Sequence, residues 1–299
     1  MNSTENIRTI FPADYPRLLK EAVTIMDDPP KEIYIRGDLP SDDHIFLTVV
    51  GSRQYSEYGK AACESLIAGL HGLPVVIVSG LALGIDSIAH EAALAAGLQT
   101  IAVPGSGLAD EMLYPPTHIG IARRILAAGG CLLSPFEKTV MGNKWTFPYR
   151  NAIMAGLSHA TLVIEAATQS GTLITARRAM DFYRDVLVVP GSIFSKKSEG
   201  AFEYMREGAT PIACAEDLIF ALGLEDAARA RDTETEKIRP LRPDLTESEQ
   251  RLIAALAEPR SRDRLIQALG IQAAEANALI SKLELSGVIE ERLGQIRKV

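Results

Sequence analysis

The sequence predicts an α/β protein with a doubly wound, mostly parallel sheet, followed by a small C-terminal winged helix. Between residues 45 and 190, short and continuous apolar runs alternate with helical patterns. Such runs are typical of strands buried on both faces of a parallel sheet, and strand–helix alternation implies right-handed crossovers. After residue 244, three helical patterns precede two short strand patterns, which favours a winged helix.

Each element of the sheet domain is assigned from its own pattern. Strands are expected at 45–50, 74–79, 99–103, 131–136, 160–165 and 185–190, where β-branched and other apolar residues run together. The intervening helices are expected at 56–71, 85–96, 117–128, 147–157 and 172–182. Together these elements predict one doubly wound α/β domain over residues 44–222.

The chain on either side of this domain differs in composition. Residues 1–43 contain two proline-bearing stretches and 9 acidic against 5 basic residues. They predict a short helical and irregular entry segment, too small for a core of its own. Residues 223–243 alternate charges and end in a proline-rich stretch, which predicts a linker.

The C-terminal block, residues 244–299, opens with a helix start signal, because Glu249 follows Thr246 at the spacing of a capping box. Helices are expected at 246–257, 261–268 and 272–286, and Gly294 separates two strands of a wing. The block holds 9 acidic and 8 basic residues. It therefore lacks a strong electrostatic footprint for duplex DNA, and we favour a protein-interaction role.

The net charge of −7 excludes a uniformly basic nucleic-acid-binding protein. The entry segment carries −4 of this charge and residues 44–222 only −2, so a local basic strip within the core is compatible with it. Neither an 18-residue apolar run nor a signal-peptide pattern occurs, and we expect a cytoplasmic protein. Cys63, Cys131 and Cys214 lie far apart among apolar neighbours; we expect buried thiols and neither disulfides nor a zinc site.

Small residues follow several predicted strands at the point where each strand ends. Ligands of open parallel sheets bind at the carboxyl ends of the strands, and helix N-termini favour anions, so these turns predict a phosphate-binding crevice. Its candidate residues are Gly51, Ser52, Arg53, Gly80, Ser170, Gly171 and Thr172. The alternative to phosphate binding is that Ser170 or Thr172 only caps the helix that begins there.

A second cluster, KWTFPYRN, interleaves aromatic and cationic residues from Lys144 to Asn151. Bases stack on aromatic faces while Lys and Arg neutralise phosphates, as in grooves that bind single strands. We expect Lys144, Phe147 and Arg150 to be functional. Trp145, the only tryptophan of the chain, is expected to be a packing residue.

Catalytic and cofactor motifs are scarce. No G-x-G-x-x-G follows the first predicted strand, and the sequence contains no P-loop, G-x-S-x-G or H-E-x-x-H. Asp86 and His90 lie four residues apart on a predicted helix, where a local contact is the simpler interpretation. We therefore expect no enzyme activity, no cofactor and no metal ion.

Four stretches together resemble the DprA/Smf family (DNA-processing protein A): VVGSR, SGLALGID to TIAV, FPYRN to ARRA, and VLVVPGS. The resemblance extends over roughly residues 12–222, and a winged helix is a common appendage in that family. It implies a non-enzymatic Rossmann-like protein that binds single-stranded DNA. It also implies protection of incoming strands in natural transformation, loading of the RecA recombinase, and a homodimer formed through the Rossmann-like domain.

The resemblance implies DNA contacts as well. Those in the pocket would come from Arg53, Lys144, Phe147, Arg150 and Asn151, with backbone phosphate at Ser170, Gly171 and Thr172. The chain departs from the family pattern at Ala152, where a second arginine is usual, and at Phe202, where an asparagine is usual. Its longer loop over residues 105–115 adds Asp110 and Glu111 near the crevice.

Two other functions stay open. The core is also similar to that of LOG-type nucleotide phosphoribohydrolases, with the signature PGGxGTxxE. The nearest match is TQSGTLIT, in which Thr175 stands at the position of the glutamate. The second alternative is regulation of duplex DNA by the winged helix.

Overall fold

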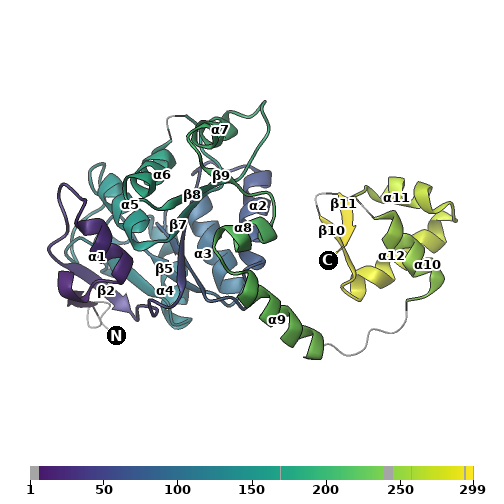
Figure 1. Ribbon diagram of the computed structural model, residues 1–299, viewed down its shortest axis with the longest axis horizontal. Coiled ribbons are helices and arrows are strands. Elements are labelled where there is room, and N and C mark those ends of the chain that lie inside the picture. The colour runs from purple at the N-terminus through teal and green to yellow at the C-terminus, as the bar shows by residue number, and fades with distance from the viewer. Residues whose placement is uncertain (1–6, 169, 239–244, 257, 293, 299) are drawn as a thin grey trace. The chain divides into compact units, whose positions relative to one another are not determined.

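Nine strands form one sheet in the computed structural model, which describes residues 7–168, 170–238, 245–256, 258–292 and 294–298 (Figure 1). In their order across the sheet they are β1 (Ile7–Ile10), β2 (Ile33–Gly37), β6 (Cys131–Ser134), β5 (Gln99–Ala102), β4 (Val75–Ser79), β3 (Ile45–Val50), β7 (Ala160–Val163), β8 (Asp185–Val188) and β9 (Thr210–Pro211). The strands from β6 to β9 run parallel, while β1 and β2 are antiparallel at one edge. The predicted mostly parallel sheet is confirmed.

Helices cover both faces of this sheet. On one face lie α1 (Arg17–Val23), α5 (Thr146–Leu157), α6 (Gly171–Asp181) and α7 (Glu199–Arg206), and on the other α2 (Glu57–Ala68), α3 (Ile85–Ala95), α4 (Ile119–Ala127) and α8 (Ala215–Ala221). Short 3-10 turns occur at Pro12–Asp14, Asp110–Met112, Pro116–His118 and Lys196–Ser198. In β3, Phe46 packs in the apolar core on the face covered by α1, α5, α6 and α7, and Leu47 packs in the core on the opposite face. Burial on both faces explains why the strands read as continuous apolar runs.

The order of strands reverses at β3. From β3 the chain adds β4, β5 and β6 on one side, and later places β7, β8 and β9 on the other. At such a switch point the loops after neighbouring strands diverge and leave a crevice at the carboxyl edge. The topology therefore places a ligand site beyond the ends of β3, β4 and β7.

The entry segment, expected to be helical and irregular, also adds two strands to the sheet. Ile33 and Ile35 of β2 are fully buried and pack with Leu19 of α1, while Tyr34 and Arg36 alternate with them. The expectation was incomplete because β2 spans only five residues. Alternation over so short a run gives a weak strand signal.

The predicted linker, residues 223–243, contains the helix α9 (Glu225–Ile238). Leu224 and Ala228 pack against the core beside α8, and the Arg231 guanidinium donates to two backbone carbonyls at the end of α2 at 3.0 Å. These three residues recur at helical spacing, a pattern that the alternating charges obscure. The rest of the predicted linker, 239–243, lies outside the described residues.

The cysteines do not all behave as expected. Cys63 and Cys131 are buried, and burial raises the pKa of both thiols. Cys214 is exposed, so that prediction is wrong. It occupies the extended N-cap position of α8, where a side chain lies outside the packed face of the helix, and its alanine neighbours are too small to indicate burial.

Three helices and a two-stranded wing follow α9: α10 (Glu247–Ala255), α11 (Arg262–Leu269), α12 (Ala273–Leu285), β10 (Ile289–Arg292) and β11 (Gln295–Lys298). The capping box is present, since the Thr246 hydroxyl accepts the N–H of Glu249, whose carboxylate accepts the N–H of Thr246 at 2.7 Å. The chain divides into an N-terminal unit, Met1–Asp232, and a C-terminal unit, Thr233–Val299. Leu252, Leu265 and Leu283 belong to an apolar core formed within the C-terminal unit. The predicted winged helix is confirmed.

Replacing Leu283 by alanine is expected to destabilise the C-terminal unit by about 2–5 kcal/mol, because truncation of a core leucine leaves a cavity. Leu283 is 1% exposed, whereas Leu285 on the same helix is 91% exposed. Leu285→Ala should change the free energy of unfolding by less than about 0.5 kcal/mol. Urea unfolding of the full chain, followed by circular dichroism, measures both. Equal effects of the two substitutions would contradict this core.

The Glu249 carboxylate also lies 2.7 Å from Nζ of Lys282 on α12. Its bond to Lys282 and those to Thr246 lower the pKa of Glu249 from 4.5 to about 2. A pKa lowered by folding stabilises the protein above the unfolded-state value, and this contribution is lost as the pH falls through the folded-state value. The stability advantage of wild type over Glu249→Gln should thus be present at neutral pH and vanish between about pH 4.5 and 2. Urea midpoints across that range measure it; a constant difference would refute it.

Candidate functional site

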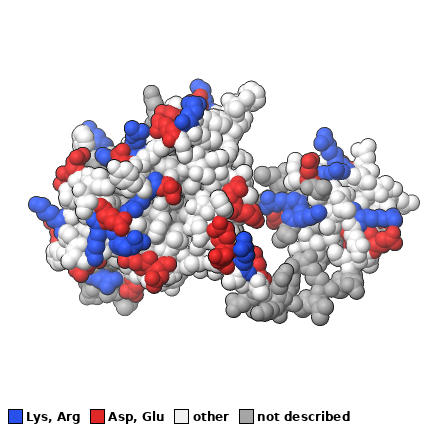
Figure 2. Space-filling view, viewed as in Figure 1, with Lys and Arg blue, Asp and Glu red and all other residues white. Residues whose placement is uncertain are grey.

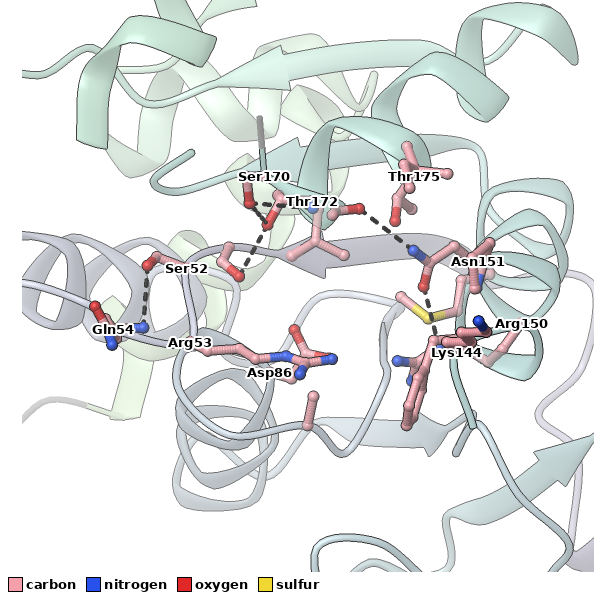
Figure 3. A pocket seen from close by; sticks show the side chains of 18 residues that line it. Ser52, Arg53, Gln54, Asp86, Lys144, Arg150, Asn151, Ser170, Thr172 and Thr175 are labelled. Atoms are coloured by element: carbon pink, nitrogen blue, oxygen red, sulfur yellow. Dashed lines mark hydrogen bonds between the residues drawn. The ribbon is translucent and has the colours of Figure 1, made fainter. Parts of the chain in front are cut away.

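A crevice of about 540 Å³ opens beyond the carboxyl ends of β3, β4 and β7. In Figure 3, Arg53 and Asp86 lie on one side of it, Lys144, Arg150 and Asn151 on the other. The lining includes every predicted site residue except Gly80: Gly51, Ser52, Arg53, Lys144, Phe147, Arg150, Asn151, Ser170, Gly171 and Thr172. Segments far apart in the sequence therefore meet at the predicted edge of the sheet.

The loops after β3 and β4 approach each other closely. Gly84 has a φ of +85°, and the backbone of Ser52 and Arg53 occupies the space that a Cβ would need. The Ile85 N–H donates to the Ser52 carbonyl at 3.2 Å. This fixed backbone carries the exposed Arg53 side chain, whose guanidinium carbon lies 5.5 Å from the centroid of the Phe147 ring. A cation and an aromatic ring are thus paired at the crevice.

Phe147 is positioned by the first turn of α5. The Thr146 hydroxyl donates to the Gly105 carbonyl at 2.6 Å, and the Phe147 ring fills the space where a side chain at residue 105 would lie. Phe147 is half-buried and lies 6.3 Å, centroid to centroid, from the ring of Tyr114. The loop after β5 thereby holds one edge of the ring.

Trp145, predicted to be a packing residue, is 74% exposed. The backbone N–H of Trp145 donates to Oδ1 of Asn143 at 2.9 Å, and Nζ of Lys144 lies 5.0 Å from the centroid of the Trp145 ring. The prediction is wrong because residue type alone assigned this side chain to the core. Trp145 occupies the N-cap position of α5, away from the face that packs on the sheet.

Arg150 is buried beneath the crevice and binds protein backbone. Its Nη1 donates to the carbonyls of Gly80 and Val103, which directly follow β4 and β5. The Gly80 N–H donates to the Asp86 carboxylate at 3.1 Å. A Cβ at Gly80 would overlap both the guanidinium and this carboxylate. Gly80 therefore makes room for Arg150, which ties α5 to two strand ends.

Burial dominates the titration of the two charged groups. It lowers the pKa of Arg150 to about 10, which leaves the guanidinium charged at neutral pH. It raises the pKa of Asp86, and the Arg150 charge opposes that shift. His90, four residues beyond Asp86, places Nδ1 at 2.8 Å from Oγ1 of Thr100. Asp86 and His90 thus do not bond to each other: Asp86 accepts from Gly80, and His90 pairs with Thr100.

The turn at the start of α6 combines capping with exposure to the crevice. The Ser170 hydroxyl accepts the N–H of Thr172 at 3.2 Å, so the capping interpretation is correct. The Thr172 hydroxyl donates to the Gly51 carbonyl at 3.0 Å, which joins this turn to the loop after β3. The same residues line the crevice at the positive end of the helix dipole. Capping therefore leaves the anion-binding hypothesis in place.

The charged groups around the crevice are sparse. Asp110 of the longer loop, expected near the crevice, is paired instead with Arg36 and with Arg123, the latter at 3.0 Å. In the view of Figure 2, positive and negative side chains are interspersed over the N-terminal unit. The exposed cations of the lining are Arg53 and Lys144. This distribution fits a narrow cationic strip better than a broad basic face.

Sequence reasoning did not place Gln54, Asp86 and Thr175 in the lining, although all three contribute to it. Asp86 lies in the first turn of α3, the helix that follows the loop after β4, and that position was a usable signal. Within the described ranges, no cluster of three or more His, Cys, Asp or Glu residues is arranged to hold a metal ion. None of the described helices combines the length and apolarity needed to cross a bilayer.

The fold and the site define a class: an α/β protein with a cationic and aromatic crevice at the switch point of its sheet, joined to a winged helix. The family model described as DNA recombination-mediator protein A matches residues 6–223, and the model of the DprA winged helix domain matches residues 236–295. The chain therefore belongs to the DprA/Smf family.

Relatives from several bacteria support this membership. Protein Smf of Escherichia coli is 38% identical over 213 residues, which are 70% of this chain and 55% of that protein. DNA processing protein DprA of Streptococcus pneumoniae is 40% identical over 198 residues, 64% of this chain and 67% of that one. The chain thus spans little more than half of the Escherichia coli relative.

Two solved structures are similar as well. That of DprA from Streptococcus pneumoniae has a TM-score of 0.65 at 36% identity and covers 73% of this chain and 75% of its own. That of DNA processing protein A from Helicobacter pylori has a TM-score of 0.64 at 30% identity, and the match covers 74% of this chain and 98% of that one. The latter is described as giving insights into a unique single-stranded DNA binding mode.

Arg150→Ala is expected to lower the free energy of unfolding of the N-terminal unit by about 1–3 kcal/mol, because it removes the buried donor that bonds the carbonyls of Gly80 and Val103. Lys144→Ala removes an exposed cation from the same segment and should change stability by less than about 0.5 kcal/mol. Urea unfolding of both variants makes the comparison. An Arg150→Ala protein as stable as wild type would refute the anchoring role.

Proposed function

We propose that the crevice binds single-stranded DNA without reading its sequence. The observation that carries this proposal is the pairing of Arg53 with the Phe147 ring, with Lys144 on the same lining. Aromatic rings stack on any base, and nearby cations neutralise the backbone. A crevice with these groups and few other charges suits an unpaired strand.

The lining residues divide by the chemistry that they offer. Arg53 and Lys144 supply exposed positive charge to phosphates, and Phe147 supplies a stacking face. Neutral donors and the helix terminus, which contact phosphate or sugar oxygens, are Ser52, Asn151, Ser170, Gly171 and Thr172. Arg150 and Gly80 act differently: they fix the position of α5 and need not touch the strand.

Family membership supports the same assignment. The Helicobacter pylori relative is described as having a single-stranded DNA binding mode, and its similarity covers the domain that contains the crevice. The family model names a recombination mediator. The residues that form the crevice here lie within the range that the family model matches, 6–223.

The wider role is also a proposal. We infer that the chain protects incoming single strands in natural transformation, helps to load RecA on them, and works as a homodimer through its Rossmann-like domain. Family membership is the support for these roles. Size-exclusion light scattering, with oligo-dT and RecA added in turn, tests the dimer and the ternary assembly.

The winged helix fits a protein contact better than duplex DNA in this proposal. A recognition helix needs cationic side chains free to contact phosphates. The only basic residue of α12 is Lys282, whose Nζ is held 2.7 Å from Glu249. A duplex is accordingly expected to compete poorly with oligo-dT for the full chain.

Binding of labelled oligo-dT should weaken with salt, with log K falling against log salt at a slope of about −0.7 per phosphate contacted. Arg53→Ala or Lys144→Ala should each weaken binding and flatten the slope by about one contact. Fluorescence anisotropy over a salt series measures both. Lys20→Ala, an exposed lysine on α1 outside the lining, is the matched control. Failure of oligo-dT to bind the full chain at low salt would overturn the proposal.

A further inference from the structure

Beside the crevice, the chain exposes its single tryptophan. Trp145 is 74% exposed, and Met141 on the preceding loop is 72% exposed. Tyr114, which lies against Phe147, is 53% exposed. Large apolar side chains gathered on one rim mark an interaction surface more often than scattered single residues do. The aromatic rim, defined as Tyr114, Trp145 and Phe147, adjoins the cationic lining, since Trp145 lies against Lys144 and Phe147 against Arg53.

The same arrangement, a cation over an aromatic ring, occurs twice at the rim. Arg53 lies over Phe147 with 5.5 Å between guanidinium carbon and ring centroid, and Lys144 lies over Trp145 with 5.0 Å between Nζ and ring centroid. Phe147 and Arg53 belong to the crevice lining, whereas Trp145 lies outside it. Each pair offers a ring for a base and a cation for a phosphate.

The backbone beneath Trp145 is fixed although its side chain is exposed. The Trp145 N–H donates to Asn143 Oδ1 at 2.9 Å, and the Asn143 N–H donates to Oγ1 of Thr146 at 2.9 Å. Thr146 in turn is bonded to Gly105 at 2.6 Å. A stacking surface held in this way loses little backbone freedom on binding, which favours affinity.

We propose that Trp145 is a second base-stacking position, just outside the crevice, for the nucleotide next to the one that stacks on Phe147. Lys144 then neutralises phosphate at the boundary between the two positions. The occupant is an unpaired base of a single strand, because a base within a duplex does not expose its face. The inference rests on the proposed function and extends it from one stacked base to two.

The tryptophan provides its own probe, since it is the only one in the chain and can be excited selectively over the eight tyrosines. Titration with oligo-dT should quench the emission of Trp145 over the same concentration range in which the anisotropy of labelled oligo-dT rises. Trp145→Ala should weaken binding about fivefold or more, because base–aromatic stacking is worth at least about 1 kcal/mol. Trp145→Phe keeps a ring and should recover most of that loss.

Two controls separate stacking from structural damage. Phe220→Ala removes another exposed ring, 72% exposed on α8 and outside the crevice lining, and should leave affinity unchanged. Trp145→Ala should preserve the salt slope of wild type, whereas Lys144→Ala should flatten it. Unfolding midpoints of the Trp145 variants should match that of wild type.

The outcomes distinguish this inference from the proposed function. If labelled oligo-dT binds and Trp145→Ala binds as tightly as wild type, the second stacking position is overturned while the crevice proposal stands. If oligo-dT binds neither wild type nor any variant at low salt, both are overturned. Quenching together with a fivefold loss that Trp145→Phe recovers supports the second position.

Discussion

The buried guanidinium of Arg150 is the contact on which the geometry of the site depends. It bridges the carbonyls that follow β4 and β5 and thereby joins the first half of α5 to the carboxyl edge of the sheet. The absence of a side chain at Gly80 leaves the room that this guanidinium occupies. Because Lys144 to Phe147 precede Arg150 on the same segment, their position over the crevice follows from this anchor.

A buried cation that bonds to the protein adds less to the binding of a ligand than a cation that faces solvent. Arg150 contributes charge to the floor of the crevice, but its hydrogen bonds go to the carbonyls of Gly80 and Val103 and to the Asn151 side chain. Arg53 and Lys144, in contrast, are exposed. With few free cations, electrostatic attraction alone gives modest affinity. Ring faces add a contribution that salt does not screen, so the net charge of −7 is compatible with the proposed binding of a single strand.

Several elements of the fold were predictable because their signals are local. The six apolar runs became β3 to β8, and the capping box at Thr246 and Glu249 formed as the spacing indicated. Signals failed where a partner far along the chain decides the outcome. The strand β2 needs β6 beside it. Leu224 and Ala228, at the start of α9, pack on residues of α8, and Cys214 is exposed because it lies at a helix end.

The sequence by itself determined the α/β class, the winged helix, and the set of segments that supply the site, since periodicity and turn residues are properties of neighbouring positions. Only the tertiary structure decided which of these residues are exposed at the crevice and which are buried. Arg150 meets carbonyls 70 and 47 residues away, whereas the Trp145 ring, with Lys144 beside it, stays 74% exposed to solvent among the described residues. The physical reason is that burial is set by what packs across from a residue, and that partner is brought in by the path of the chain through the sheet.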